Sequence, residues 1–260
     1  MMTSNIKFDG KVYRYIEKKL KIEKLHMTLI DPDKQSAKIA GRIGTQAENA
    51  GSDAIMVGGS TGVSNEKLDD TVLALKDSCD IPVILFPTSS NVISMHADAI
   101  YYMSMLNSRS LKYVIGEQVR AAQYIKKIGL EAIPMGYVII EPGMKVGEVG
   151  HAKVVKRDDI KQACDYACAA ELLGMKLVYL EAGSGAPKPV PPEMVRAVKA
   201  QLSIPLIVGG GIRTAGDASK TSRAGADIIV TGTIVEEVRD IEVTLKEIIK
   251  AIKSHAYKSC

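Results

Sequence analysis

Carboxylates stand directly after two short apolar segments of the chain, where buried strands would end. Asp31 and Asp33 follow Leu25–Ile30, and Glu181 follows Leu177–Leu180. Hard oxygen ligands suit Mg²⁺, which keeps several waters and also uses substrate phosphates, and a carboxylate at a strand end suits a general base. We therefore expect Asp31 to bind Mg²⁺ and Glu181 to accept a proton. The alternatives are a turn in which Asp33 caps the next helix and a Glu181 that only pairs with a Lys or Arg.

Small residues are concentrated after four of the apolar segments. The stretches are Gly58–Gly62, Glu181–Gly185, Gly209–Gly211 and Gly232–Thr233. Backbone N–H groups bind phosphate well where a loop turns into a helix, because they are unpaired there and the helix dipole favours negative charge. Barrels built from eight βα units characteristically bind phosphate after their seventh and eighth strands. The last two stretches therefore predict a phosphate site, with Thr214 capping the following helix. Ser60, in the first stretch, is a second oxygen ligand for Mg²⁺ beside Asp31.

Short apolar segments alternate with longer amphipathic ones along the whole chain. The apolar segments are Leu25–Ile30, Ala54–Val57, Pro82–Phe86, Ala99–Leu106, Ala132–Ile140, Leu177–Leu180, Pro205–Val208 and Ile228–Val230. The amphipathic segments include Ser36–Ala50, Lys112–Ile128, Asp158–Leu173, Pro192–Leu202, Thr214–Ala224 and Ile241–Ile252. Continuous β-branched segments separated by helices are typical of a parallel sheet covered on both faces. About eight units without a break in composition predict one (β/α)₈ TIM barrel domain over residues 1–260, with an N-terminal helix.

Two stretches depart from the regular alternation. Only about a dozen residues separate Phe86 from Ala99, which is enough for a loop and a single turn. Either the third βα unit is short and irregular, or one strand is wrongly assigned. The stretch 142–156 is long for a βα connection, and we interpret it as a mobile flap over an active site. A disordered insertion is the alternative.

Composition and charge exclude several classes of protein. The 260 residues are 46% hydrophobic and 25% charged, with a net charge of +4, as in a globular domain with a sizeable core. The basic stretch Lys11–Lys24 alternates with apolar residues at helical spacing, so we expect an amphipathic helix and no nucleic-acid partner. The four cysteines form no C-x-x-C pair, and the four histidines show no metal-ligand spacing. Without a signal sequence or a membrane-spanning segment, we expect a cytoplasmic protein.

With these motifs assembled, the sequence resembles the geranylgeranylglyceryl phosphate synthase family, archaeal prenyltransferases of ether-lipid biosynthesis. The resemblance extends from His26 to Thr233. The motifs that carry it are His26–Asp33, Val57–Ser60, Pro87–Ser90, Leu106–Ser108, Tyr179–Gly185 and Val208–Ile212. Together they are far more specific than a single glycine-rich turn.

The resemblance implies transfer of a C20 chain from geranylgeranyl diphosphate to the 3-hydroxyl of sn-glycerol 1-phosphate, with Mg²⁺ and release of diphosphate. It implies that Asp31 and Ser60 bind Mg²⁺. It also implies that family members form homo-oligomers without stable insertion into a membrane. The glycerol phosphate would be held by Tyr179, Leu180, Glu181, Ala182, Gly183, Ser184, Gly185, Gly210, Gly211, Gly232 and Thr233.

The chain departs from some family members at Leu29, where they carry a Lys two residues before the first Asp of the motif. This departure leaves open which cation besides Mg²⁺ neutralises phosphate. The C20 tail needs an apolar groove. Candidates for its lining are Tyr101, Tyr102, Met103, Met105, Val92 and Ile93, about half of which must face the core because side chains alternate along a strand.

Other functions share parts of this pattern. The same reaction with a longer, heptaprenyl donor differs only in the length of the groove. A phosphosugar isomerase or lyase would use the late glycines but would not need Asp31, Ser60 or an apolar groove. A phosphate-binding barrel without activity is the non-enzymatic alternative.

Overall fold

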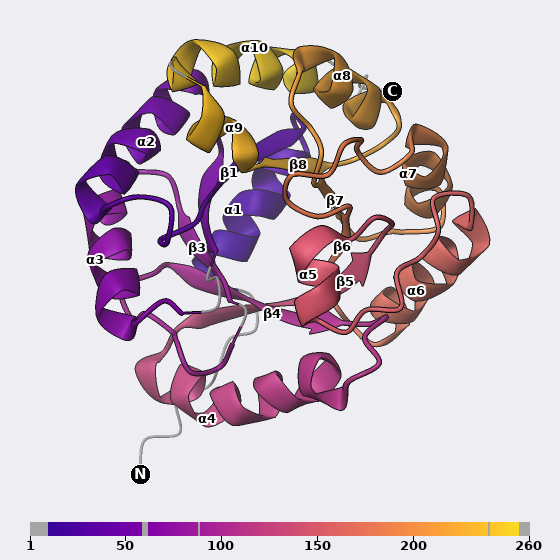
Figure 1. Ribbon diagram of the computed structural model, residues 1–260, viewed down its shortest axis with the longest axis horizontal. Coiled ribbons are helices and arrows are strands. Elements are labelled where there is room, and N and C mark those ends of the chain that lie inside the picture. The colour runs from indigo at the N-terminus through magenta and orange to yellow at the C-terminus, as the bar shows by residue number, and fades with distance from the viewer. Residues whose placement is uncertain (1–9, 59–61, 88, 239, 255–260) are drawn as a thin grey trace.

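The computed structural model describes residues 10–58, 62–87, 89–238 and 240–254. Eight parallel strands form a closed barrel in chain order, each hydrogen-bonded to the next and the last to the first (Figure 1). The strands are β1 (Leu25–Ile30), β2 (Ala54–Gly58), β3 (Val83–Phe86), β4 (Ala99–Met105), β5 (Glu131–Ile139), β6 (Leu177–Glu181), β7 (Leu206–Gly209) and β8 (Ile228–Thr231). The predicted (β/α)₈ TIM barrel is confirmed.

Helices surround the barrel as an outer ring (Figure 1). The ring contains α2 (Ala37–Ala50), α3 (Asn65–Lys76), α4 (Glu117–Ile128), α6 (Ile160–Leu172), α7 (Pro192–Lys199), α8 (Ala215–Arg223) and α10 (Ile241–Lys253). Three further helices are α1 (Lys11–Leu20), α5 (Met144–Val149) and α9 (Thr233–Glu237), and a π-helical turn, η1 (Lys112–Gly116), leads into α4. No described helix is long and apolar enough to span a bilayer.

Side-chain alternation along the strands divides the core into two parts. On β4, Ile100 packs outward against the helices, whereas Tyr101 packs inward with the barrel interior. On β6, Val178 and Leu180 point outward and Tyr179 points inward. The interior is therefore filled by alternate residues of every strand, as close packing of such a barrel requires.

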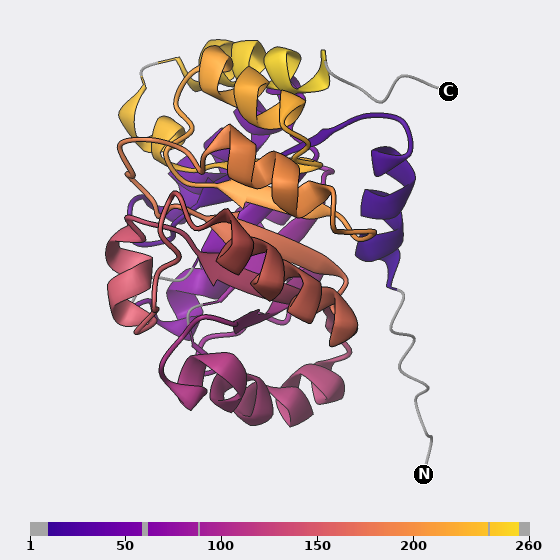
Figure 2. The ribbon, with the colours of Figure 1, turned by 90° about the vertical axis from the view of Figure 1, so that its right-hand side faces the viewer.

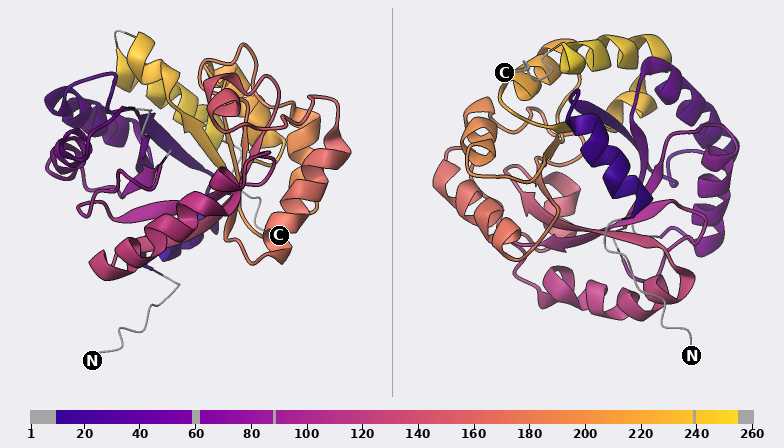
Figure 3. Two further views of the ribbon diagram at one scale, coloured as in Figure 1. Left: turned by 60° about the horizontal axis from the view of Figure 1, so that its bottom comes forward. Right: turned by 180° about the vertical axis from the view of Figure 1, so that it is seen from behind.

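Helix α1 closes the end of the barrel where the strands begin. Figure 2 shows α1 at one end of the barrel and α5 and α9 at the other, and the right-hand view of Figure 3 shows α1 lying across the opening. Its apolar face, Val12, Tyr13 and Ile16, is buried in the interior cluster. The backbone N–H groups of Val12 and Tyr13 donate to the Glu131 carboxylate at 2.9 and 2.8 Å. The predicted amphipathic N-terminal helix is therefore a plug of the barrel.

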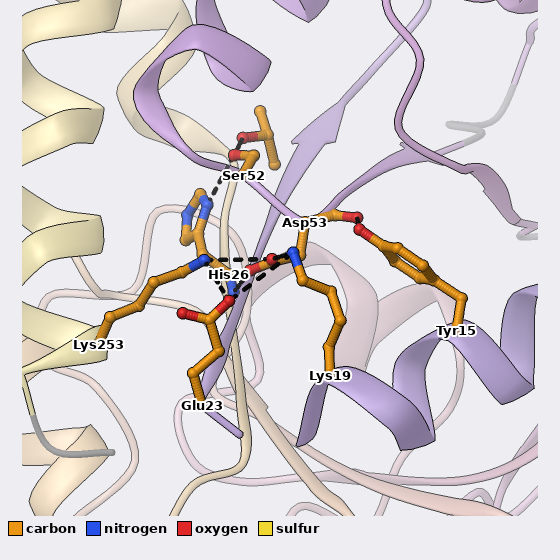
Figure 4. Close-up of polar contacts among 8 residues, drawn as sticks. Tyr15, Lys19, Glu23, His26, Ser52, Asp53 and Lys253 are labelled. Atoms are coloured by element: carbon orange, nitrogen blue, oxygen red, sulfur yellow. Dashed lines mark hydrogen bonds and ion pairs between the residues drawn. The ribbon is translucent and has the colours of Figure 1, made fainter. Parts of the chain in front are cut away.

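A buried carboxylate attaches this plug to the barrel and to the last helix (Figure 4). Asp53 precedes β2 and is 1% exposed. It forms ion pairs with Lys19 of α1 and with Lys253 of α10, the latter at 3.2 Å, and accepts the His26 N–H at 2.9 Å. Because a buried charge is stable only when it is paired, Asp53 holds these three segments together.

The third βα unit is irregular, as predicted. No helix forms between β3 and β4 in the described part of residues 87–98. The two strands share only two registered pairs, Ile84 with Ala99 and Leu85 with Ile100. This gap in the outer ring lies between α3 and α4 (Figure 1).

The stretch 142–156 was predicted to be a mobile flap over an active site, with a disordered insertion as the alternative. Its residues Val146, Val149 and Gly150 line the cavity at the strand ends, and its regular structure contradicts the disordered insertion. It contains α5 and returns to the barrel, where Val155 N–H donates to Ile139 and Glu141 N–H to Val155, at 3.0 and 2.8 Å. The Asn107 side-chain amide donates to the carbonyls of both Ile139 and Lys153, at 2.8 and 3.0 Å. These long-range backbone bonds are not visible in the local composition of the stretch.

Candidate functional site

A cavity of about 300 Å³ opens at the end of the barrel where the strands terminate. Asp31, Glu181, Ser184 and Gly232 line it together. The carboxylates after β1 and β6 and the turn after β8 therefore face one space, as the sequence predicted. Apolar side chains line the rest of the cavity, including Leu29, Phe86, Ile93, Ile100, Tyr101, Met103, Met105, Tyr137, Val146 and Val149.

Glu181 is the most deeply buried carboxylate of the cavity, at 6% exposed. Its Oε1 accepts the Gly183 N–H at 2.6 Å, and it also accepts hydrogen bonds from the hydroxyls of Tyr137 and Tyr179. Burial raises the pKa of Glu181, while these three hydrogen bonds oppose the rise. The partners are amide and hydroxyl groups, not the Lys or Arg of the structural alternative. A buried carboxylate with a raised pKa is suited to accept a proton near neutral pH.

Aromatic rings form the floor beneath Glu181. Phe86 lies edge-on to Tyr137, with ring centroids 5.4 Å apart, and 5.7 Å from Tyr179. Tyr137 and Tyr179 are 5.2 Å apart. The interior below the rings is filled by buried side chains, so Glu181 stands at the base of an apolar, water-poor pocket.

Glycines allow the loops after β6 and β7 to pack against each other. Gly210 has φ +81°, and a β-carbon there would meet the Glu181 carboxylate and lie 2.6 Å from the Gly183 nitrogen. Gly211 has φ +72°, and its β-carbon would lie 2.6 Å from the Lys188 carbonyl. Any other residue would be strained and would displace Glu181 or the neighbouring loop. The triglycine therefore shapes the loop that carries Ser184.

The residues predicted to hold phosphate lie on the three loops that follow β6, β7 and β8, and of them Glu181, Ser184 and Gly232 line the cavity. Ser184 and Thr233 bring the loops after β6 and β8 together, with their hydroxyl oxygens 3.4 Å apart. Thr214 caps α8 as predicted, accepting the Asp217 N–H at 3.0 Å. Leu180 and Ala182 are also among the predicted residues, but their side chains pack outward under the helices. Such residues can offer only backbone groups to a ligand.

Asp31 lies in a tight turn at the cavity mouth. Its Oδ1 accepts the Asp33 N–H at 3.0 Å, and its carbonyl accepts the Lys34 N–H at 3.0 Å. The following helix begins at Ala37 with Ser36 at its N-cap position, so the idea that Asp33 caps it is wrong. Lys34 and Gln35 separate Asp33 from the N-cap residue Ser36, so Asp33 lies too far from the first turn of the helix.

The other predicted Mg²⁺ ligand, Ser60, lies outside the described residues. Among the residues that the structure describes, no group of three or more His, Cys, Asp or Glu could hold a metal ion. One carboxylate beside loops predicted to bind phosphate is nevertheless a donor set that fits Mg²⁺, because this ion is usually held by one or two carboxylates, waters and substrate phosphates.

The apolar part of the cavity extends outward through the irregular third unit. Of the predicted groove residues, Ile93, Tyr101, Tyr102, Met103 and Met105 line it. Val92 lines a neighbouring pocket instead. The far part is formed by residues that sequence reasoning missed, Ile100 of β4 and Gln118, Ala121 and Ile125 of α4. Ile100 faces outward on its strand, so the cavity passes from the barrel mouth to the space beneath α4.

Several polar residues of the cavity were also missed, among them Tyr137, Lys34 and Glu236. Of these, Tyr137 could most easily have been predicted. It lies on β5 next to the outward-facing Val138, so strand alternation turns its side chain inward. Lys34 and Glu236 line the mouth and lie 3.9 Å apart, Nζ to Oε2. Glu236 is on α9, about 200 residues from Lys34 in the chain, and no local pattern indicates that they meet.

His26, although part of a sequence motif, is structural as predicted. It is fully buried, with Nδ1 2.8 Å from Ser52 Oγ and Nε2 2.9 Å from Thr231 Oγ1. Burial lowers the pKa of His26 to about 4, so the ring is neutral at physiological pH. It packs between the barrel and the helices and does not line the cavity.

These features define a (β/α)₈ barrel in which polar loops at the strand ends open into an apolar channel. The chain belongs to the PcrB family, whose profile matches residues 15–252. It is 56% identical to the geranylgeranylglyceryl phosphate synthase of Thermococcus gammatolerans over 239 residues, 92% of this chain and 95% of the relative. It is 52% identical to that of Picrophilus torridus, over 93% and 99% of the two chains.

Solved structures agree with the family assignment. A crystal structure of (S)-3-O-geranylgeranylglyceryl phosphate synthase from Thermoplasma acidophilum, in complex with its substrate sn-glycerol-1-phosphate, is 48% identical. It matches with a TM-score of 0.92 over 95% of this chain and 100% of that one. A thiamine phosphate pyrophosphorylase from Pyrococcus furiosus, 14% identical with a TM-score of 0.59 over 89% and 96% of the chains, shares the fold alone.

Proposed function

We propose that this protein transfers a geranylgeranyl group from geranylgeranyl diphosphate to the 3-hydroxyl of sn-glycerol 1-phosphate, forming an ether bond and releasing diphosphate. The observation that carries this proposal is the continuity of one cavity. Its polar end contains Asp31, Ser184 and Gly232, and its apolar end reaches Ile125 beneath α4. A phosphosugar isomerase or lyase has no need of the apolar end. Membership of the PcrB family supports the same reaction.

The loops after β6, β7 and β8 are the proposed site for glycerol phosphate. Backbone N–H groups and the hydroxyls of Ser184 and Thr233 are short, rigid donors that suit a phosphate. A phosphate at this position would place the glycerol part of the substrate toward Glu181, which lines the same cavity.

Glu181 is the proposed general base. The acceptor hydroxyl must lose its proton as the ether bond forms, and Glu181 is the carboxylate buried at the base of the pocket. Hydrogen bonds from Gly183, Tyr137 and Tyr179 hold it in one orientation. A fixed, poorly hydrated base near the acceptor contributes both position and basicity.

Asp31 is the proposed protein ligand for Mg²⁺, together with Ser60. Bound Mg²⁺ would neutralise the negative charge that grows on a leaving diphosphate. Asp31 is held in place by its own turn at the cavity mouth, so its carboxylate is oriented before any ligand arrives.

The aromatic and apolar lining has the task of excluding water. An allylic diphosphate that ionises beside water would give the free alcohol, and a dry site prevents this side reaction. Phe86, Tyr101 and Tyr137 form this lining on the acceptor side, and their ring faces can also stabilise developing positive charge.

The same barrel is proposed to work as a homo-oligomer. Leu111, Ile115 and Val119 lie along η1 and α4 and are 76%, 53% and 66% exposed. Apolar side chains that recur on one helix face suit an interface. Light scattering after gel filtration tests this, and a monomeric mass would overturn it.

The proposed activity is tested by incubating the purified protein with Mg²⁺, sn-glycerol 1-phosphate and diphosphates of C15, C20 or C35 chain length. We expect the C20 donor to give the highest kcat/KM. A preference for C35 would assign the longer donor, and no prenyl transfer with any of them would refute the proposed reaction.

A further inference from the structure

Lysine is the only cationic residue type that lines the cavity among the described residues, and it does so at two positions, Lys34 and Lys145. Both substrates of the proposed reaction, the prenyl donor and the acceptor, carry phosphate. The site must therefore neutralise several negative charges. Leu29, two residues before Asp31, lines the cavity with an apolar side chain and offers no charge to a phosphate. The neutralising side chain must therefore come from elsewhere.

Lys34 is placed beside the proposed Mg²⁺ ligand. The turn that orients the Asp31 carboxylate ends at Lys34, whose N–H donates to the Asp31 carbonyl at 3.0 Å. Its ammonium lies 3.9 Å from Glu236 on α9, the helix that starts at the Gly232 turn. Lys34 and Glu236 thus connect the loop after β1 to α9, which follows β8, at the polar end of the cavity.

The ion pair is weak enough to be exchanged for a ligand. The side chains of Lys34 and Glu236 are 56% and 30% exposed, and exposed pairs at this distance contribute little to stability. Burial raises the pKa of Glu236; the nearby Lys34 opposes this rise and repulsion from Asp31 adds to it. A diphosphate presents more anionic oxygens than one carboxylate, even with Mg²⁺ bound, and would compete well for the ammonium group.

We propose that Lys34 binds the diphosphate of the prenyl donor, and that Glu236 holds its ammonium group at the cavity mouth until the donor arrives. This inference rests on the proposed prenyl transfer and names a diphosphate-binding residue for it. Lys145 is a poorer candidate, because its partner Glu148 is on the same short helix and the two side chains are 80% and 75% exposed.

The test uses full-length Lys34→Met and Glu236→Gln variants. Inorganic diphosphate with Mg²⁺ is titrated by calorimetry, and KM is measured for each substrate. For Lys34→Met we expect the Kd of diphosphate and the KM of the prenyl donor to rise about tenfold, as for loss of one charge-assisted bond. The KM of glycerol phosphate should not change, and Lys34→Arg should restore most of the affinity.

Glu236→Gln separates ligand binding from a structural ion pair. If Lys34 binds diphosphate, removing its competitor should leave the affinity equal or tighter. Equal losses in Lys34→Met and Glu236→Gln would show that only the pair matters, and would overturn the proposal. The matched control is Lys67→Met. Lys67 of α3 is 45% exposed and pairs at 3.4 Å with Asp33, the residue before Lys34. It does not line the cavity.

Two further results also decide the matter. Loss of diphosphate affinity in Lys145→Met but not in Lys34→Met would assign the role to Lys145 and refute the proposal. A wild-type protein that transfers no prenyl group would refute the proposed function, whereas normal transfer and normal diphosphate affinity in Lys34→Met would refute only this inference.

Discussion

Replacing Glu181 by Gln tests the proposed chemistry most directly, because it removes basicity with little change in shape. The Gln carbonyl oxygen can still accept the Gly183 N–H that Glu181 accepts at 2.6 Å, and its amide group can meet the hydroxyls of Tyr137 and Tyr179. A positioned general base typically contributes about 10²- to 10⁴-fold to a rate. We expect kcat to fall by about 100-fold at neutral pH, with a much smaller change in the KM of glycerol phosphate.

The pH dependence gives a second measure of the same role. Burial raises the pKa of Glu181 above its usual value, so wild-type activity should be lost as the pH falls through that raised pKa. The Gln variant has no such group, and its remaining activity should lack this acidic limb. Initial rates with radiolabelled glycerol phosphate, measured from acidic to mildly alkaline pH, test both effects.

Stability distinguishes this prediction from a folding defect. A carboxyl with a raised pKa binds its proton more tightly in the folded state, so its ionisation destabilises the fold as the pH rises toward neutrality. The Gln variant should therefore be no less stable than the wild type in urea at pH 7. The exposed Glu148→Gln is the control and should keep full activity. A near-normal rate in Glu181→Gln would refute the role of the base.

Three other perturbations follow from the described contacts. Asp31→Asn should lower prenyl transfer at least about tenfold, as expected when a positioned Mg²⁺ ligand is lost, and should raise the Mg²⁺ concentration needed for half-maximal rate; an unchanged Mg²⁺ response would contradict its role. Burial lowers the pKa of His26 from 6.5 to about 4, so the unfolded chain takes up a proton first as the pH falls. The free energy of unfolding should drop by up to about 3 kcal/mol between pH 6.5 and pH 4. Urea titrations should show a smaller drop in His26→Gln. An identical drop in both proteins would contradict the lowered pKa of His26. Asp53→Asn leaves Lys19 and Lys253 without their buried partner, and we expect it to lower the free energy of unfolding by about 2 to 3 kcal/mol. The loss is smaller than for a fully buried pair because both lysines are partly exposed. An unchanged Tm in thermal unfolding would contradict a stabilising role of the cluster.

The local sequence pattern was sufficient to predict the strands. Leu25–Ile30 was predicted at its observed bounds, and the other strands within one or two residues. Buried parallel strands are short, continuous and apolar, so neighbouring residues in the chain carry the signal. The helix α3 was not among the predicted segments. The helix and the return to the barrel in 142–156 were not predicted, because they depend on hydrogen bonds to the distant residues Asn107 and Ile139.

The sequence by itself determined the eight βα units and the glycine-rich loops after the strands, because these follow from residues close together in the chain. It also identified Asp31 and Glu181 as residues of one site, since every strand of a parallel barrel ends at the same face. Only the tertiary structure decided which groups surround them. The tyrosine hydroxyls on Glu181, the contact between Lys34 and Glu236, and the channel beneath α4 join residues distant in sequence, and their meeting depends on barrel closure and on side-chain packing.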